Sequence, residues 1–323
     1  MDQNRKPIAR RTGGKLCYAD PGVWRRFLEE RDLDPALAAA WSKFARSNIR
    51  LIPSATFDED NTRPGTSKLG GLPDLPVGVA WPTRAPYRYP RMEDDFRPQA
   101  AWEPQPLSFL AQINLGDVAE AGCDLPLPKA GLLLFFYDTE TQPWGFDPLD
   151  EPGSRVLFVR AETTTRRQVD PAAVSSRVRP LQLHPYQGLP SREWLQDENQ
   201  DDPRYSDDAF YEELQKLSDQ DEQEISFAGH MLGGWPNLIQ HPMELECEMV
   251  RHGIYAGDSE GHADPRVAAL RRSAKDWRLL LQLSSDDDLG WMWGDVGKIY
   301  YWCREGDIAQ GLFERAWTIL QCS

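Results

Sequence analysis

Residues Ser67 to Pro82 read SKLGGLPDLPVGVAWP, and they decide how the rest of the chain is interpreted. The adjacent glycines Gly70 and Gly71 suit either a phosphate-binding loop or a tight structural turn. A phosphate loop leads from its glycines into a helix and usually carries a lysine with Ser or Thr. Here Leu-Pro-Asp-Leu-Pro follows the glycines and cannot open a helix cleanly. The stretch therefore predicts a structural turn and no nucleotide site.

The second half of the chain repeats this turn and the runs that follow it. The matching motifs are GGLPDL at 70–75 with GGWPNL at 233–238, FLAQI at 109–113 with LLLQL at 279–283, and GLLLFFY from 131 with GKIYYWC from 297. Their order is preserved, and the separations are 163, 170 and 166 residues. Matches in one order at nearly constant separation predict an internal duplication. The second glycine pair lacks a lysine, which also favours the structural interpretation.

Short apolar runs bounded by turn residues predict buried strands, because they are too short for helices. These runs are 107–115 and 131–138; residues 49–55, 155–159 and 177–183 predict further strands. Asp-Pro pairs at 20–21 and 34–35 predict two helix starts near the N-terminus. Residues 84–106, rich in proline, aromatic and charged side chains, predict a long surface excursion.

Charge is the strongest compositional feature, because 51 acidic residues against 36 basic ones leave a formal net charge of −15. Such a field repels nucleic acid and anionic lipid, so we expect no direct nucleic-acid binding and no membrane partner. It attracts cationic partners, and a basic nucleic-acid-handling protein is one such partner. The alternative is that the charge serves solubility alone.

Two acidic clusters stand out within this balance. The stretch from Trp194 to Gln223 has only Arg204 and Lys216 as cations, and its central part predicts a solvated surface helix. The second cluster, SSDDDLGWMWGD at 284–295, sets three aspartates beside two tryptophans that we expect in the core. Its aspartates form either a solvated loop or a partner contact, since the EF-hand pattern for calcium is incomplete. The predicted partner-binding residues are Asp201, Asp202, Asp207, Asp208, Glu212, Glu213, Asp286, Asp287 and Asp288.

Cysteine usage and the absence of long apolar runs predict a cytoplasmic protein. The basic N-terminus lacks the apolar region of a secretory signal, and the longest apolar run, 132–137, is far too short to span a bilayer. No pair has C-x-x-C spacing, so we expect free thiols at all five cysteines: Cys17, Cys123, Cys247, Cys303 and Cys322.

Metal binding and catalysis find little support in the motifs. His230, His241, His252 and His262 recur at gaps of 11, 11 and 10 residues, but intervening glycines and prolines forbid one continuous helix. None belongs to a metal-binding motif, and neither a G-x-S-x-G elbow nor a recognisable catalytic cysteine occurs. We therefore expect no metal, no cofactor, no catalytic residue and no enzymatic activity.

Taken with these motifs, the sequence resembles the YwqG-like domain family. The resemblance covers most of the chain from about Leu51 and rests on SKLGGLPDLPVGVAWP, LSFLAQINL, LPLPKAGLLLFFYD, HMLGGWPNLIQ, WRLLLQLSSDDDLGWMWGDVGKIYYW and AWTILQCS. It implies an α+β fold that is internally duplicated and rich in antiparallel strands, here with N-terminal helices. The expected organisation is a helical segment over 1–48 and a duplicated domain over 49–323. The repeats are approximately 49–190 and 225–323, with an acidic insert over 194–224.

The resemblance also implies a function, since some family members look like immunity proteins encoded beside polymorphic and type VI secreted toxins. Family catalytic residues are not established, so none is carried over. The leading hypothesis is an antitoxin that binds a cognate basic toxin, a DNase effector of a type VI secretion system, as a heteromeric complex. The alternative is an enzyme or small-ligand-binding protein that uses a cleft between the two repeats. A scaffold or regulatory protein without a toxin neighbour is a third hypothesis.

Overall fold

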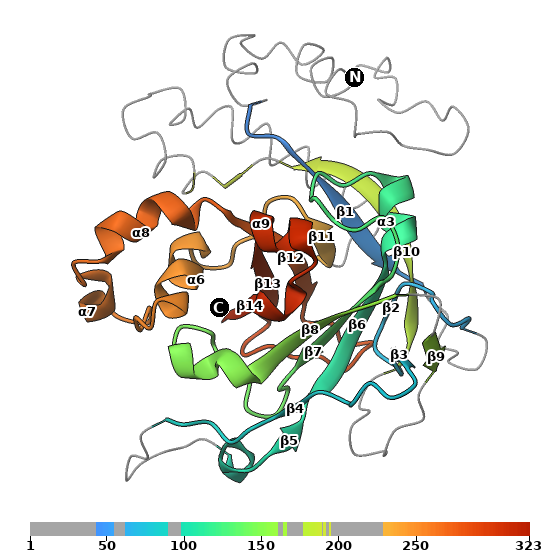
Figure 1. Ribbon diagram of the computed structural model, residues 1–323, viewed down its shortest axis with the longest axis horizontal. Helices are drawn as coiled ribbons and strands as arrows, with labels where there is room; N and C mark the ends of the chain where they lie inside the picture. The colour runs from blue at the N-terminus through green and yellow to red at the C-terminus, as the bar shows by residue number, and fades with distance from the viewer. Residues whose placement is uncertain are drawn as a thin grey trace, which may run out of the picture.

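The computed structural model describes residues 43–54, 62–89, 98–160, 164–166, 177–188, 190, 191, 194 and 229–323. The predicted N-terminal helices and, apart from Trp194, the acidic insert lie outside these residues. The described chain is a mixed fold in which one large antiparallel sheet is flanked by short helices (Figure 1).

The main sheet has ten strands in the order β14-β13-β12-β11-β1-β10-β2-β6-β7-β8. Every neighbouring pair is antiparallel. The central pair is β1 with β10; we call β2, β6, β7 and β8 the first wing and β11 to β14 the second wing. Their bounds are β1 Arg46–Pro53, β2 Lys68–Leu69, β6 Ser108–Asn114, β7 Leu132–Tyr137, β8 Ser154–Val159, β10 Arg179–Gly188, β11 Met231–Gly233, β12 Trp277–Ser284, β13 Lys298–Arg304 and β14 Trp317–Gln321.

Shorter elements connect and cover these strands. Two small ribbons pair β3 (Asp74–Pro76) with β9 (Thr164–Arg166) and β4 (Thr83–Arg84) with β5 (Gln105–Pro106). The helices are α3 Leu115–Ala121, α6 Glu244–Arg251, α7 Ser259–His262, α8 Val267–Ala274 and α9 Glu305–Gln310. Short 3₁₀ helices span Gln99–Trp102, Pro148–Gly153 and Phe313–Arg315. The strands predicted at 107–115, 131–138 and 155–159 are therefore confirmed as β6, β7 and β8.

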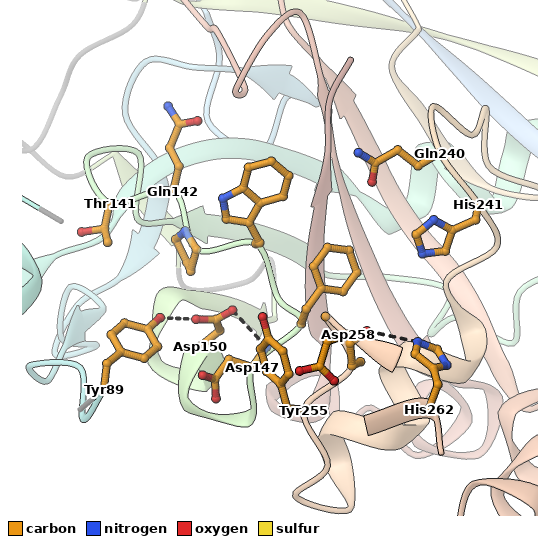
Figure 2. A pocket seen from close by; sticks show the side chains of 15 residues that line it. Tyr89, Thr141, Gln142, Asp147, Asp150, Gln240, His241, Tyr255, Asp258 and His262 are labelled. Atoms are coloured by element: carbon orange, nitrogen blue, oxygen red, sulfur yellow. Dashed lines mark hydrogen bonds between the residues drawn. The ribbon is translucent and has the colours of Figure 1, made fainter. Parts of the chain in front are cut away.

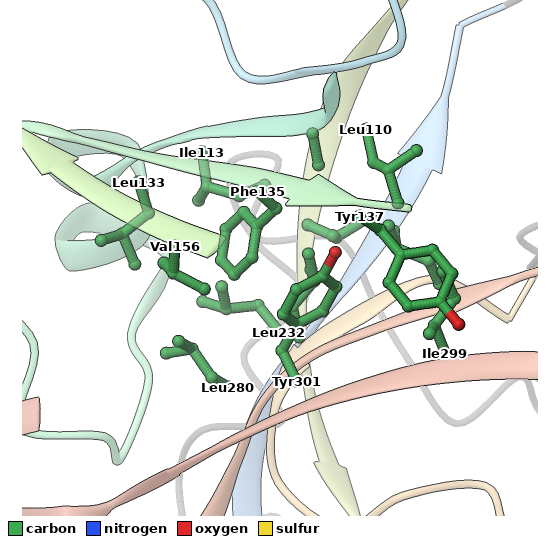
Figure 3. Close-up of a cluster of buried hydrophobic side chains, with 14 of the residues drawn as sticks. Leu110, Ile113, Leu133, Phe135, Tyr137, Val156, Leu232, Leu280, Ile299 and Tyr301 are labelled. Atoms are coloured by element: carbon green, nitrogen blue, oxygen red, sulfur yellow. The ribbon is translucent and has the colours of Figure 1, made fainter. Parts of the chain in front are cut away.

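The sheet curls so that its two wings pack against each other. Phe135 on β7 and Tyr301 on β13 stand near opposite ends of the strand order, yet their ring centroids lie 5.1 Å apart. The Tyr301 hydroxyl donates to the carbonyl of Phe136 at 3.1 Å. The two edge strands also meet, where the hydroxyls of Ser154 and Thr318 lie 2.8 Å apart. The central core therefore mixes side chains of both wings (Figure 3).

Strands of the second wing bury both of their faces, because helices cover the side turned away from the central core. On β13, Ile299 and Tyr301 enter the central core, while Tyr300 and Trp302 join a second apolar cluster. That second cluster includes Cys247 and other α6 side chains. Helices α6, α7 and α8 gather on this side of the sheet (Figure 1). Two buried faces explain why these strands read as continuous apolar runs.

The opening stretch forms the turn that its sequence predicts. Gly70 and Gly71 have φ of 61° and 70°, and Gly233 and Gly234 have φ of 70° and 73°, a region where only glycine is comfortable. No helix follows Gly71, because the chain continues into the short strand β3. The rest of the stretch covers the outer face of β6 and β7, and the indole of Trp81 donates to the Leu107 carbonyl at 2.8 Å.

A buried glutamine on β6 holds the first glycine turn. The side-chain amide of Gln112 donates to the carbonyl of Thr66 at 2.9 Å, and its oxygen accepts from the backbone N–H of Asp74, also at 2.9 Å. Gln112 is fully buried. Two residues before it, Leu110 lies at a register shift between β6 and β7.

A buried glutamine on β12 does the same for the second glycine turn. Gln282 donates to the carbonyl of Gly229 at 2.6 Å and accepts from the backbone N–H of Asn237 at 2.9 Å. Gln282 is also fully buried. Leu280, two residues before it, lies at a register shift between β12 and β13.

The surface excursion predicted for residues 84–106 is wrong for Arg84, Tyr87, Tyr89, Ala100 and Ala101, which are buried, whereas several of the other described residues are exposed. Arg84 is buried, and its guanidinium pairs with Asp138 and donates to the carbonyls of Ala100 and Glu103 at 2.7 and 2.9 Å. Tyr87 packs beside it and donates to the same aspartate at 3.0 Å. A buried arginine with this many acceptors is a structural anchor, and its partners are distant in sequence.

Candidate functional site

A cleft of about 710 Å³ lies between the two wings (Figure 2). One wall comes from Tyr89 and the loop that follows β7, residues 141–150. The opposite wall comes from residues 240, 241 and 255–258 with His262, all belonging to the second wing and its helices. Segments at least 90 residues apart in sequence thus supply its two walls.

The first wall is fixed by a carboxylate that collects backbone donors. Asp150 accepts from the N–H of Gly145 at 2.7 Å, and the Tyr89 hydroxyl donates to its other oxygen. Asp147 caps the turn Pro148–Gly153 by accepting from the N–H of Leu149 at 2.8 Å. Burial raises the pKa of Asp150, although these hydrogen bonds oppose the shift.

Gly145 explains why this loop lies against the edge of the sheet. Its φ is +83°, and a Cβ at this position would stand 2.0 Å from the carbonyl oxygen of Thr318 on β14. The indole of Trp317 donates to the Gly145 carbonyl at 2.8 Å, and Leu320 N–H donates to the Trp144 carbonyl at 3.0 Å. The loop therefore pairs with the edge strand β14 and carries the cleft side chains with it.

The second wall includes two histidines, His241 and His262, on the same side of the cleft (Figure 2). His241 donates from Nε2 to Glu246 Oε1 at 2.9 Å, and this hydrogen bond raises its pKa above 6.5. Its ring stacks on Phe146 with 6.3 Å between centroids. The Nε2 atom of His262 lies 3.1 Å from the carbonyl of Ala256.

The cleft combines carboxylates with exposed aromatic faces. Asp147, Asp150 and Asp258 line it, and no described lysine or arginine does. Trp144 and Tyr255 are 47% and 46% exposed, which is high for such large apolar side chains. Acidic groups beside open aromatic rings favour cationic guests over anionic ones.

A family described as a domain of unknown function (DUF1963) matches residues 67–322. The chain belongs to the DUF1963 family. YwqG-like proteins are members of it, so the resemblance seen in the sequence holds at the level of the family. Every residue that lines the cleft falls within the DUF1963 match. No curated protein sequence matches the chain.

The structure of this DUF1963 protein describes three of the predicted partner-binding residues: Asp286, Asp287 and Asp288. The others lie outside the described residues: Asp201, Asp202, Asp207, Asp208, Glu212 and Glu213. Asp286 bonds His230 at 3.2 Å and Arg179 at 3.4 Å, and its side chain is 8% exposed. Asp287 and Asp288 are exposed, with Asp288 3.1 Å from Arg179. The predicted tryptophans Trp291 and Trp293 are buried.

His230, Asp286 and Ser284 lie close together without forming a nucleophilic triad. The backbone N–H of Ser284 donates to Nδ1 of His230 at 3.2 Å, so Nε2 carries the proton that faces Asp286. Both ring nitrogens are thus occupied, and neither is free to take a proton from the Ser284 hydroxyl. Burial lowers the pKa of His230, which keeps its ring neutral.

Two of the four regularly spaced histidines that were considered as metal ligands in the sequence lie at the cleft. His241 and His262 line it, whereas His230 is buried elsewhere and His252 bonds the carbonyl of Glu248 at 2.9 Å. Within the described residues, no three His, Cys, Asp or Glu side chains are grouped as metal ligands.

The described helices all fall short of the length and hydropathy that a membrane-spanning segment needs.

Sequence reasoning missed Tyr89, Trp144, Asp147, Asp150 and Tyr255. They lie in loops or, for Asp150, in a short 3₁₀ helix, where hydrophobic periodicity gives no information. The only available signal was the density of turn-forming and aromatic residues in TQPWGFDPLDEP, residues 141–152.

Proposed function

We propose that this protein binds a cationic protein partner at the acidic, aromatic cleft between its wings, and that it acts as a cytoplasmic immunity protein for a secreted toxin. The observation that carries the proposal is the cleft lining, where carboxylates and exposed rings occur without a described lysine or arginine. The net charge of −15 supports it, because such a field speeds encounter with a basic partner. The toxin assignment rests on the family resemblance.

The geometry suggests how an arginine or lysine of the partner is held. Trp144 and Tyr255 offer ring faces for a cation–π contact, which contributes roughly 0.5–2 kcal/mol. Asp147 and Asp258 supply negative charge at the cleft, while Asp150 is already engaged by Gly145 and Tyr89. Trp, Tyr and Arg are the residue types that dominate binding energy at protein interfaces. The cleft thus has the composition of an interface centre.

The experiment mixes the purified protein with the nuclease encoded beside it and measures DNA cleavage and the Kd of the complex. Trp144→Ala and Tyr255→Ala should each weaken binding roughly tenfold or more, with the fold intact by circular dichroism. Asp147→Asn with Asp258→Asn should lower the association rate at low salt, and both asparagines preserve the caps.

Asp287→Asn with Asp288→Asn is the matched control, because it removes two exposed carboxylates that do not line the cleft. If only this control weakens the complex, the predicted loop and not the cleft is the interface. Undiminished cleavage at a stoichiometric excess of the protein would refute the immunity function altogether.

A second candidate function is the binding of a small cationic molecule, with or without turnover. The volume of the cleft favours it, since pockets of about 300–1,000 Å³ typically hold small ligands. Thermal-shift measurements with spermidine and choline discriminate the two functions. Stabilisation that Trp144→Ala abolishes would favour the small ligand, whereas no shift together with capture of the nuclease would favour the protein partner.

We further propose that the two wings derive from one duplicated unit. Three observations support this: the strand order β2, β6, β7, β8 parallels β11, β12, β13, β14, buried glutamines hold both glycine turns, and register shifts precede both glutamines by two residues. Superposition of the wings tests it. Equivalences that depart from the sequence separations of 163, 170 and 166 would argue against a common origin.

A further inference from the structure

A second pocket, of about 570 Å³, adjoins the acidic cleft and shares His241 and His262 with it. We call it the helix pocket, because α6 and α8 supply half of its lining residues; Arg46 of β1 and Trp277 of β12 also line it. The charged side chains of the helix pocket differ from those of the cleft. Cationic and acidic side chains both face it.

Glu246 is the buried group of this pocket whose hydrogen bonding is incomplete. Its side chain is 4% exposed, and Oε1 accepts from His241 at 2.9 Å. The other oxygen, Oε2, is buried and has no hydrogen-bond partner in the part of the chain that the structure describes. An unpaired buried carboxylate oxygen is unfavourable, so a small side-chain movement that admits an N–H donor from the pocket would stabilise it. Glu244, two residues earlier in the same helix, is also buried and lines the same pocket.

Four cationic side chains line the same pocket: Arg46, Arg271, Arg272 and Lys275. Arg271 and Arg272 are exposed on α8, and neither forms an ion pair with a residue that the structure describes. Lys275 follows directly after α8. Arg46 stacks its guanidinium 3.5 Å above the ring centroid of Trp235, which leaves its N–H edge as a donor. Such groups are suited to a carboxylate.

We propose that the helix pocket binds a small zwitterion of the α-amino-acid type, with its ammonium group donating to Glu246 and its carboxylate held by Arg271 and Arg272. The unpaired oxygen of a buried glutamate selects the ammonium, and the arginines select the carboxylate. A ligand with only one of these groups leaves either the glutamate or the arginines without a partner. The proposal does not depend on the toxin-binding function, because the cleft and the helix pocket use different charged side chains.

The test is a thermal-shift screen of the full chain against the individual L-amino acids, followed by calorimetry of those that stabilise it. Each stabilising amino acid is compared with its decarboxylated amine and its deaminated acid. We expect the amino acid to bind at least tenfold more tightly than either analogue. Glu246→Gln should weaken it tenfold or more, and Arg271→Gln with Arg272→Gln should do the same.

Glu120→Gln and Lys129→Gln are matched controls at exposed positions of the other wing, and both should bind as the native chain does. The arginine variant keeps the test decisive if Glu246→Gln fails to fold, because exposed arginines are not needed for the core. No stabilisation by any amino acid at 10 mM, or about equal affinity for the deaminated acid, would overturn the proposal. Unchanged affinity in the arginine variant would overturn it as well.

Discussion

Replacing Glu244 with glutamine should stabilise the protein relative to the native chain as the pH rises from 5 to 8. Glu244 lies in the first turn of α6 and is 8% exposed, with Met243 N–H donating to its carboxylate at 3.1 Å. Burial raises its pKa from 4.5 to about 7, with Arg46 lowering the value and Glu246 raising it. The other titratable groups that line the same pocket are His241, His262, Arg271, Arg272 and Lys275.

The sign follows from the raised pKa. Between pH 4.5 and about 7 the folded state holds a proton that the unfolded chain releases, so its contribution to stability is complete below pH 4.5. That contribution is lost as pH rises through about 7. The shift corresponds to roughly 3 kcal/mol, and most of it falls between pH 5 and 8. Glutamine has no proton to lose and keeps an acceptor for Met243 N–H.

Urea unfolding of the native chain and of Glu244→Gln at half-unit steps from pH 5 to pH 8.5 measures the effect. The difference in unfolding free energy between the two proteins should change by about 2–3 kcal/mol across this range, in favour of the variant. Glu120→Gln, at an exposed position, should run parallel to the native chain. A difference that stays constant within about 0.5 kcal/mol across the series would refute the reasoning.

Three further substitutions test the architecture by chemical or thermal unfolding. Gln282→Leu leaves Gly229 C=O and Asn237 N–H without a buried partner and should cost roughly 2–4 kcal/mol; a loss below about 1 kcal/mol would contradict this role. Gly145→Ala should cost about 3 kcal/mol or more, because its Cβ would meet a β14 carbonyl at 2.0 Å, and an unchanged melting temperature would show that the loop shifts freely. Asp286→Ala should lower the free energy of unfolding by roughly 2–4 kcal/mol, because it removes the partner of His230 and Arg179. Asp287→Ala, at the neighbouring exposed position, should change it by no more than about 0.5 kcal/mol. Equal effects would argue against an anchoring role for Asp286.

Local chemistry was enough to predict the strands and the glycine turns. The runs at 107–115 and 131–138 are apolar without alternation because both faces of β6 and β7 are covered, which a short bounded run indicates. Gly70 and Gly71 were correctly predicted as a turn, since no sequence of Leu-Pro-Asp-Leu-Pro opens a helix. These features depend on neighbours in sequence.

Features that depend on distant partners were not predictable. Arg84 sits in a segment whose composition indicates exposure, yet Asp138, 54 residues away, and backbone carbonyls of the same segment satisfy its guanidinium in the interior. The cleft is a stronger example, because Trp144 and Tyr255 line one cleft only when the two wings fold against each other. Neither residue belongs to a periodic pattern. The chemistry of the cleft is created by tertiary structure alone.

The contrast between global and local charge bears on which ligands can reach the helix pocket. A chain of net charge −15 repels anions at distances up to the Debye length, about 8 Å at physiological salt, before any side chain is contacted. The cations at Arg46, Arg271 and Arg272 therefore stand in a surrounding field that opposes free anions and nucleic acid. A zwitterion has no net charge, so that field neither attracts nor repels it to first order. Short-range contacts with Glu246 and the arginines then decide its binding, which favours a neutral zwitterion over a simple anion as the guest of this pocket.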